Sequence, residues 1–243
     1  MSIFYTAYIQ SDFLGQCIFL SLFLLSLICW VVLIYKLWQA MRIRRMAFEF
    51  QTIFEKNKER LLSFHLQEFP QLYATSNFNP FSKIFTSLKD KTIEILNKNH
   101  FFLSIHAQEP LRVHLSTADL ESVESHVLNA ISIQSKALRQ HLFILSTITT
   151  LAPFLGLLGT VWGILMTFSA LHQGGVAGSN ALVLGGLATA LATTVLGLVI
   201  AIPALVAYNY LKNLTSDFTS DMEHFLYSLL SQLELQYRKV DPL

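Results

Sequence analysis

The sequence predicts an all-α integral membrane protein with three transmembrane helices and long cytoplasmic helical extensions. Of its 243 residues, 53% are hydrophobic and only 14% are charged, whereas soluble domains usually carry about 25% charged residues. Two long stretches, residues 13–35 and 142–211, contain no Asp, Glu, Lys or Arg. Basic residues follow the first stretch and flank the second at both ends, whereas residues 1–12 contain none. Composition, charge-free length and charge asymmetry therefore all indicate a membrane protein.

The first charge-free stretch is long enough for one membrane helix and the second for two. Residues 13–35 match the length of about 20 apolar residues that one span requires. Residues 142–211 are too long for one helix, and three glycines followed by Ser179-Asn180 predict a turn over residues 172–180. We therefore expect transmembrane helices at 13–35, 142–171 and 181–211.

The orientation follows from the basic residues beside each span, which gather on the cytoplasmic side of membranes. Residues 1–12 and the turn at 172–180 contain no Lys or Arg. We therefore expect residues 1–12 and 172–180 on the outer side, and 36–141 and 212–243 in the cytoplasm. The basic residues that support this orientation are Lys36, Arg42, Arg44, Arg45, Lys136, Arg139 and Lys212.

The cytoplasmic segments read as mostly helical. Pro70, Pro80 and Pro110 predict breaks. A new helix is expected near Ser116, with Asp119 in its first turn. Since no Gly or Pro follows, this helix is expected to continue into the second span. Apolar residues at steps of three or four after residue 212 predict that the tail extends the third span as an amphipathic helix.

Small and weakly polar residues form one stripe on each helix of the charge-free pair. Close packing of membrane helices uses such residues, and a Thr in such a helix often bonds only its own backbone. From the residues alone, packing is favoured over a pore lining. Counting from the cytoplasmic ends places Thr160 and Thr194 at one depth, as candidates for an ion pathway. The residues expected to pack are Pro153, Gly156, Gly159, Gly163, Gly186, Ala190, Gly197, Ala201 and Pro203.

No pattern of an enzyme, metal site or cofactor site is found in the sequence. Cys17 and Cys29 lie inside an apolar segment, the eight His residues lack ligand spacing, and the net charge of +1 gives no case for nucleic acid. The charge-free pair also lacks any Asp or Glu that could carry a proton. If protons cross there, the carboxylate must come from another chain.

Two segments resemble the ExbB/TolQ proteins of the MotA/TolQ/ExbB proton channel family of Gram-negative inner membranes. They are residues 151–164 (LAPFLGLLGTVWGI) and 191–204 (LATTVLGLVIAIPA), the second followed by Tyr208 and Asn209. The resemblance implies a homopentamer in the bacterial inner membrane with a periplasmic N-terminus. Its second and third helices would surround an ExbD/TolR-type single-span partner, whose intramembrane Asp would titrate. Thr160 and Thr194 fall where the family has pore-facing threonines.

The implied function is conversion of proton motive force into mechanical work on the cell envelope. A TonB-type or TolA-type protein would pass this work on, in TonB-dependent uptake or Tol-Pal-type maintenance. Thr189 occupies the position where many relatives have a Glu, so the resemblance implies assembly more directly than proton flux. The alternatives are a MotA-type stator relative, which usually has four spans, and a non-conducting scaffold or export component. Three helices without an inverted repeat disfavour a solute transporter.

Overall fold

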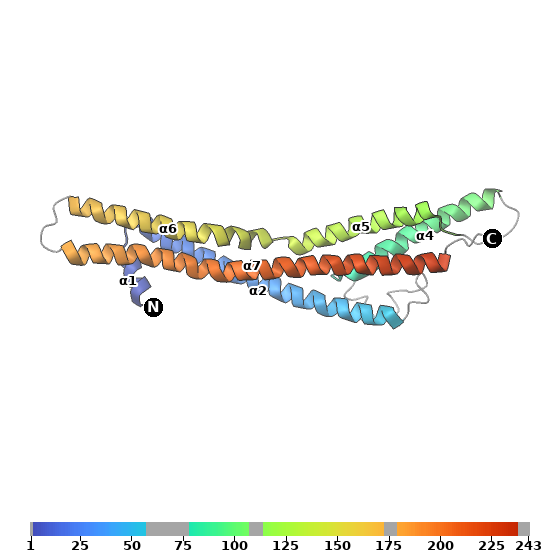
Figure 1. Cartoon of the computed structure of the whole chain (residues 1–243), viewed down its shortest axis with the longest axis horizontal. Coiled ribbons are helices and arrows are strands. Elements are labelled where there is room, and N and C mark those ends of the chain that lie inside the picture. Colours follow the sequence, from blue (N-terminus) through green and yellow to red (C-terminus); the bar gives the residue numbers. More distant parts are fainter. Residues whose placement is uncertain (1, 57–77, 107–113, 173–178, 238–243) are drawn as a thin grey trace. The chain divides into compact units, whose positions relative to one another are not determined.

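The protein is almost entirely helical in the part of the chain that its computed structural model describes, residues 2–56, 78–106, 114–172 and 179–237 (Figure 1). Three helical stretches are long and apolar enough to cross a membrane, which confirms the predicted fold class. Pro70, Pro110 and most of the predicted turn, residues 173–178, lie outside the described residues. The helices are α1 (Ser2–Gln10), α2 (Phe13–Lys56), α4 (Pro80–His106), α5 (Thr117–Arg139), α6 (Leu142–His172) and α7 (Ser179–Tyr237).

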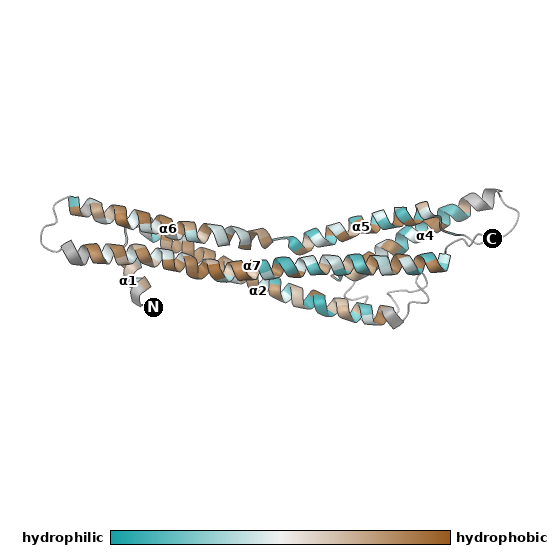
Figure 2. Cartoon of the chain, in the orientation of Figure 1, coloured by the Kyte–Doolittle hydropathy of each residue, from teal (hydrophilic) through white to brown (hydrophobic). Residues whose placement is uncertain are grey.

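The chain divides into two compact units, and α2 and α7 contribute to both. Residues 1–37 and 141–212 form the first unit, and residues 38–140 and 213–243 form the second. Hydropathy separates them: α6 and the first part of α7 are predominantly apolar, whereas α5 and the rest of α7 carry many polar residues (Figure 2). We call them the apolar unit and the polar unit.

The apolar unit packs α2, α6 and α7 around a core of aliphatic side chains. Leu22 from α2, Leu145 and Ile148 from α6, and Ala204 from α7 are at most 1% exposed. On the outer faces, large side chains such as Phe154 remain exposed. A soluble protein rarely leaves so many apolar side chains uncovered, whereas lipid would cover them without cost.

Two of the expected extensions are present as continuous helices. α7 runs without interruption from Ser179 to Tyr237, which confirms that the tail extends the third span. α2 likewise continues beyond residue 35 as far as Lys56. α1, before the first span, was not predicted from the sequence.

The expected continuity of α5 with the second span is wrong. α5 ends at Arg139, the backbone of Gln140 becomes extended with ψ 138°, and His141 has φ 69°. A positive φ is uncommon outside glycine and cannot belong to a right-handed helix. α6 then starts afresh at Leu142. The break therefore lies in the backbone at residues 140 and 141, where no Gly or Pro marks it.

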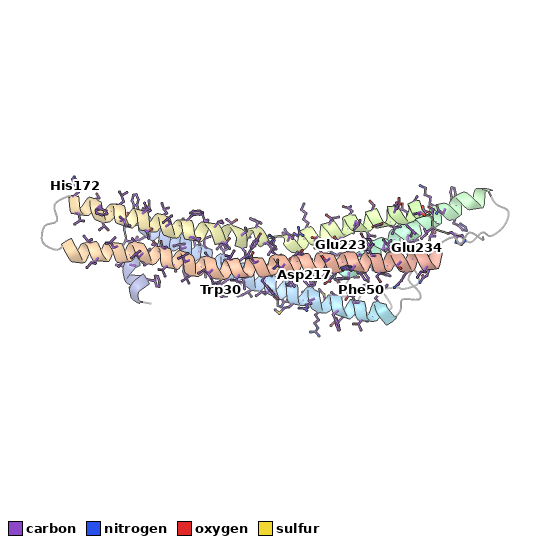
Figure 3. The ribbon with its side chains drawn as sticks, in the orientation of Figure 1. Trp30, Phe50, His172, Asp217, Glu223 and Glu234 are labelled. Carbon is purple, nitrogen blue, oxygen red and sulfur yellow. The ribbon has the colours of Figure 1, made fainter. Side chains whose placement is uncertain are left out.

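The polar unit is held by a cluster of phenylalanines in contact with α7. The ring centroids of Phe54 and Phe225 lie 5.4 Å apart, and those of Phe81 and Phe225 lie 5.6 Å apart. Phe50 is fully buried in the same cluster (Figure 3). Such edge-to-face ring pairs add to the energy of burial.

Two caps define helix starts in this unit. α4 begins at Pro80, as its lack of a backbone N–H favours, and the buried Asn79 accepts a hydrogen bond from the N–H of Phe81 (3.1 Å) and donates to the carbonyl of Met46 (3.0 Å). At α5 the Asp119 N–H donates to Ser116 Oγ, and the Ser116 N–H donates to the Asp119 carboxylate. This capping box confirms the predicted helix start.

Candidate functional site: the seam between α6 and α7

Glycines bring the backbones of α6 and α7 into direct contact. A Cβ added at Gly156 would lie 2.9 Å from both the carbonyl oxygen of Thr193 and the Cα of Thr194. At Gly163 it would lie 2.8 Å from the Cβ of Ala190. Real Cβ atoms are essentially never this close to other heavy atoms. These positions therefore require glycine because the opposing helix occupies the space of a side chain.

The same holds at three further glycines of this interface, which we call the seam. A Cβ at Gly159 would overlap the hydroxyl of Thr193, and a Cβ at Gly186 would overlap that of Thr167. At Gly197 it would come within 2.5 Å of the carbonyl oxygen of Ala152. All five predicted packing glycines thus face the opposite helix of the pair.

The remaining residues predicted to pack fall into two groups. Ala190 and Ala201 are buried at 2% and 6% exposure. Pro153 is half-buried within α6, while Pro203 is exposed on α7 in the single chain. A packing role for Pro203 stays a prediction.

Two threonine hydroxyls cross the seam to one carbonyl. Thr194 Oγ1 donates to the carbonyl oxygen of Gly156 at 3.0 Å. Thr193 Oγ1 lies 3.1 Å from the same oxygen and 2.7 Å from the carbonyl oxygen of Ala190. Thr193 is 2% exposed. Since each hydroxyl has one proton but two lone pairs, both oxygens can still accept a hydrogen bond.

The threonines of α6 bond within their own helix. Thr160 Oγ1 donates to the carbonyl of Leu157 at 2.7 Å, and Thr167 Oγ1 donates to that of Gly163 at 2.7 Å. Thr160 is 9% exposed. The hydroxyl of Thr160 therefore donates within its own helix, as a Thr in a membrane helix often does, whereas the hydroxyl of Thr194 donates to the opposite helix.

The register of the seam differs from the one counted from the helix ends. Thr194 lies opposite Gly156, and Thr160 is four residues further along α6, which corresponds to about 6 Å. The two threonines are therefore about one turn apart in depth. The glycine contacts set this register, so it cannot be derived by counting residues from the ends of the charge-free stretch.

Asp12 and Trp162 form a contact that the sequence did not indicate. Asp12 is the one Asp or Glu of the apolar unit's residues 1–37 and 141–212. One carboxylate oxygen accepts the N–H of Gly15 at 3.1 Å, which caps α2, and the other accepts the indole N–H of Trp162 at 2.8 Å. An Asp just before a long helix is a recognisable cap signal, but no pattern links positions 150 residues apart.

The described residues contain no group of three or more His, Cys, Asp or Glu that could hold a metal ion. Within the described part of the seam the available chemistry consists of hydroxyls and carbonyls. Such groups can bind water or a cation's hydration shell but cannot take up and release a proton near neutral pH. A proton pathway along this seam therefore needs a titratable group from outside it.

Comparison with known proteins adds a family to this geometry. The sequence model of the MotA/TolQ/ExbB proton channel family matches residues 97–224, more than half of the chain. Over 88 residues the chain is 41% identical to the biopolymer transport protein ExbB of Aquifex aeolicus, covering 36% of this chain and 59% of that protein.

Two other bacteria supply further relatives. Identity is 36% over 111 residues to ExbB of Xanthomonas campestris, covering 45% of this chain and 43% of the relative. It is 36% over 97 residues to the Tol-Pal system protein TolQ of Haemophilus influenzae, covering 40% and 42%. The chain thus matches about half the length of these relatives.

Proposed function

The chain belongs to the MotA/TolQ/ExbB proton channel family, and on this premise we propose that it is the channel-forming subunit of a proton-driven motor complex in a bacterial inner membrane. The complex contains several copies of this chain, five by analogy with the family, around an ExbD/TolR-type partner. It converts proton motive force into mechanical work on the cell envelope. The observation that carries the proposal is the match over residues 97–224, which includes the whole charge-free hairpin.

The proposed membrane segments are residues 13–35, 142–171 and 181–211, with residues 1–12 and 172–180 in the periplasm. The position of the basic residues supports this orientation, because those nearest the spans follow residue 35, precede residue 142 or follow residue 211. A cysteine introduced at Ser11 of a Cys17→Ser variant is then labelled by a membrane-impermeant thiol reagent from the periplasmic side. Labelling only after the cytoplasm is opened would reverse the topology.

Thr160 and Thr194 are the proposed pathway residues of this chain. Thr194 uses its proton to bond Gly156, which leaves oxygen lone pairs that can accept from water or from a protonated carboxyl. The hairpin itself has no Asp or Glu. The proton would therefore be carried by an intramembrane Asp of the partner, and the threonines would orient water and that carboxyl.

Proton flux in liposomes tests the proposal. This chain is reconstituted with its ExbD/TolR-type partner, and uptake is followed with an entrapped pH-sensitive dye under an imposed membrane potential. We expect flux that is lost when the partner's Asp is changed to Asn. Flux no greater than in that Asp→Asn control would refute channel activity.

A second candidate, a non-conducting scaffold or export component, is favoured by the hydrogen bonding of the seam. The hydroxyls of Thr160 and Thr167 donate to their own helix, and Thr189, half-buried on α7, replaces the Glu of many relatives. In this reading the small residues only pack. The liposome experiment separates the two functions, because a scaffold assembles with the partner yet carries no flux.

The client of the complex is proposed only as a class. Among the relatives are proteins named for biopolymer transport and for the Tol-Pal system. Both names fit a proton-driven complex that acts on the envelope. Copurification with either a TonB-type or a TolA-type protein would assign the client.

A further inference from the structure

Two grooves of the polar unit carry opposite charges on opposite sides of α7. The first, of about 280 Å³, lies between α2 and α7 and is lined by Arg44, Asp217 and Asp221 together with apolar side chains. We call it the acidic groove. The second, of about 380 Å³, lies between α5 and α7 and is lined by Lys136, Arg139 and Glu223. We call it the basic groove.

The charges of the two grooves are inverses of each other. The acidic groove has two carboxylates and one guanidinium, whereas the basic groove has two cations and one carboxylate. All six side chains are exposed. Within the part of the chain that the structure describes, none of the six has an ion-pair partner.

Each groove also holds a pair of like charges that is unfavourable in a single chain. Asp217 and Asp221 are four residues apart on α7, and Lys136 and Arg139 are three apart on α5, so each pair shares a helix face and repels. The position of Lys136 and Arg139 in the last turn of α5 accounts for the basic pair in part, since cations favour that end. The acidic pair lies in the interior of α7 and has no such explanation.

The grooves lie on different sides of α7 but at the same height. Asp217 and Asp221 are each two residues before a residue of the basic groove, Thr219 and Glu223, which is a rotation of about 200° around the helix. Figure 3 shows Asp217 and Glu223 on the sides of α7 that face α2 and α5, respectively. The hydroxyls of Ser135 and Thr219 are 3.0 Å apart, which sets the basic groove level with the acidic one.

We infer that the acidic groove of one copy binds the basic groove of a second copy of this chain, in a head-to-tail contact that Asp217 and Asp221 make with Lys136 and Arg139. In the same contact Arg44 faces Glu223 of the neighbouring copy. Since the two grooves are level, successive copies are related by rotation with little shift along α7, which closes a ring instead of building a filament. The inference rests on the proposed function, because it supplies the subunit contact of that oligomer.

Charge reversal with rescue tests the contact. The double variants Asp217→Lys/Asp221→Lys and Lys136→Glu/Arg139→Glu each place like charges face to face, which strongly disfavours association. We expect each to weaken the detergent-solubilised oligomer about tenfold or more, measured by native mass spectrometry over a dilution series. Combining all four changes restores opposite charges and should restore assembly.

A charge-matched control separates the contact from net charge. Asp90→Lys/Glu121→Lys changes the net charge by the same amount as the acidic double variant, at exposed positions outside both grooves. It should assemble like the wild type. Failure of the fourfold variant to recover, with intact helix content, would overturn the inference.

Disulfide cross-linking tests the head-to-tail arrangement in membranes. In a Cys17→Ser/Cys29→Ser background, Gln51→Cys places a thiol in the acidic groove and Ser132→Cys places one in the basic groove. Chains carrying one or the other, with different tags, should cross-link only when coexpressed. Self-cross-linking of either single-cysteine chain to the same extent would indicate a two-fold contact and overturn the inference.

The mass-spectrometry and cross-linking measurements require neither the partner protein nor proton flux. Normal liposome flux in both reversal variants would place the subunit contact elsewhere and leave the proposed function standing. If the wild type assembles but carries no proton flux with its partner, the proposed function is refuted and the subunit contact still stands.

Discussion

The most direct test of the seam is Gly159→Ala, which adds one methyl group where the two helices meet. The new Cβ would overlap Thr193 Oγ1 and lie 2.7 Å and 3.0 Å from the Cβ and Cγ2 of the same residue. Thr193 cannot rotate away without loss of its bonds to the carbonyl oxygens of Gly156 and Ala190.

The magnitude follows from two terms. Overpacking by one methyl costs about 1–3 kcal/mol, and a lost interhelical hydrogen bond in a membrane protein costs about 0.6 kcal/mol on average. Before helix propensity is counted, we therefore expect Gly159→Ala to lower the free energy of unfolding by roughly 1.6–3.6 kcal/mol. The better helix propensity of Ala, about 1 kcal/mol in water, acts in the other direction.

The measurement is reversible unfolding in mixed micelles with increasing SDS, followed by tryptophan fluorescence. Thr193→Ala removes two of the three atoms that the new methyl meets, Oγ1 and Cγ2, so the double variant should be more stable than the sum of the two single changes allows. Additive effects, or a Gly159→Ala variant as stable as the wild type, would refute the close contact. Val161→Ala on the exposed face of α6 is the matched control.

Three further variants address other contacts. Thr194→Val should abolish coupled flux while it leaves assembly intact, because one interhelical bond contributes only about 0.6 kcal/mol; unchanged flux would assign the hydroxyl to packing. Asp12→Ala should destabilise the apolar unit by about 1–2 kcal/mol through loss of a helix cap and shift the fluorescence of Trp162, and an unshifted spectrum would contradict the contact. Ser116→Ala should cost about 1 kcal/mol in thermal unfolding, with the exposed Ser122→Ala as a neutral control.

The long apolar helices and the glycines of the seam could be predicted because each depends on composition at fixed spacing. A charge-free run of sufficient length has few alternatives to a membrane helix, and glycines at steps of three or four share a face whatever they meet. The cap at Ser116 was equally predictable, since the side chain and the backbone that it bonds are neighbours in sequence.

Features that depend on the pairing of segments distant in the sequence could not be predicted. Thr193 lies beside the predicted stripe on α7, and only the register of the two helices directs it at Gly159. The bond from Trp162 to Asp12 has no local signal for the same reason. The helix break at His141 involves neither Gly nor Pro, so sequence reasoning favoured a continuous helix.

The direct backbone contact between α6 and α7 has a mechanical consequence. A layer of long side chains between two helices can change rotamers and absorb displacement, but at Gly156, Gly163 and Gly197 the opposing atoms include backbone or Cβ groups. Such a contact between helices deforms very little, because close-packed atoms transmit strain. The two helices would move together as one rigid body, so a force on either helix would be transmitted to the other.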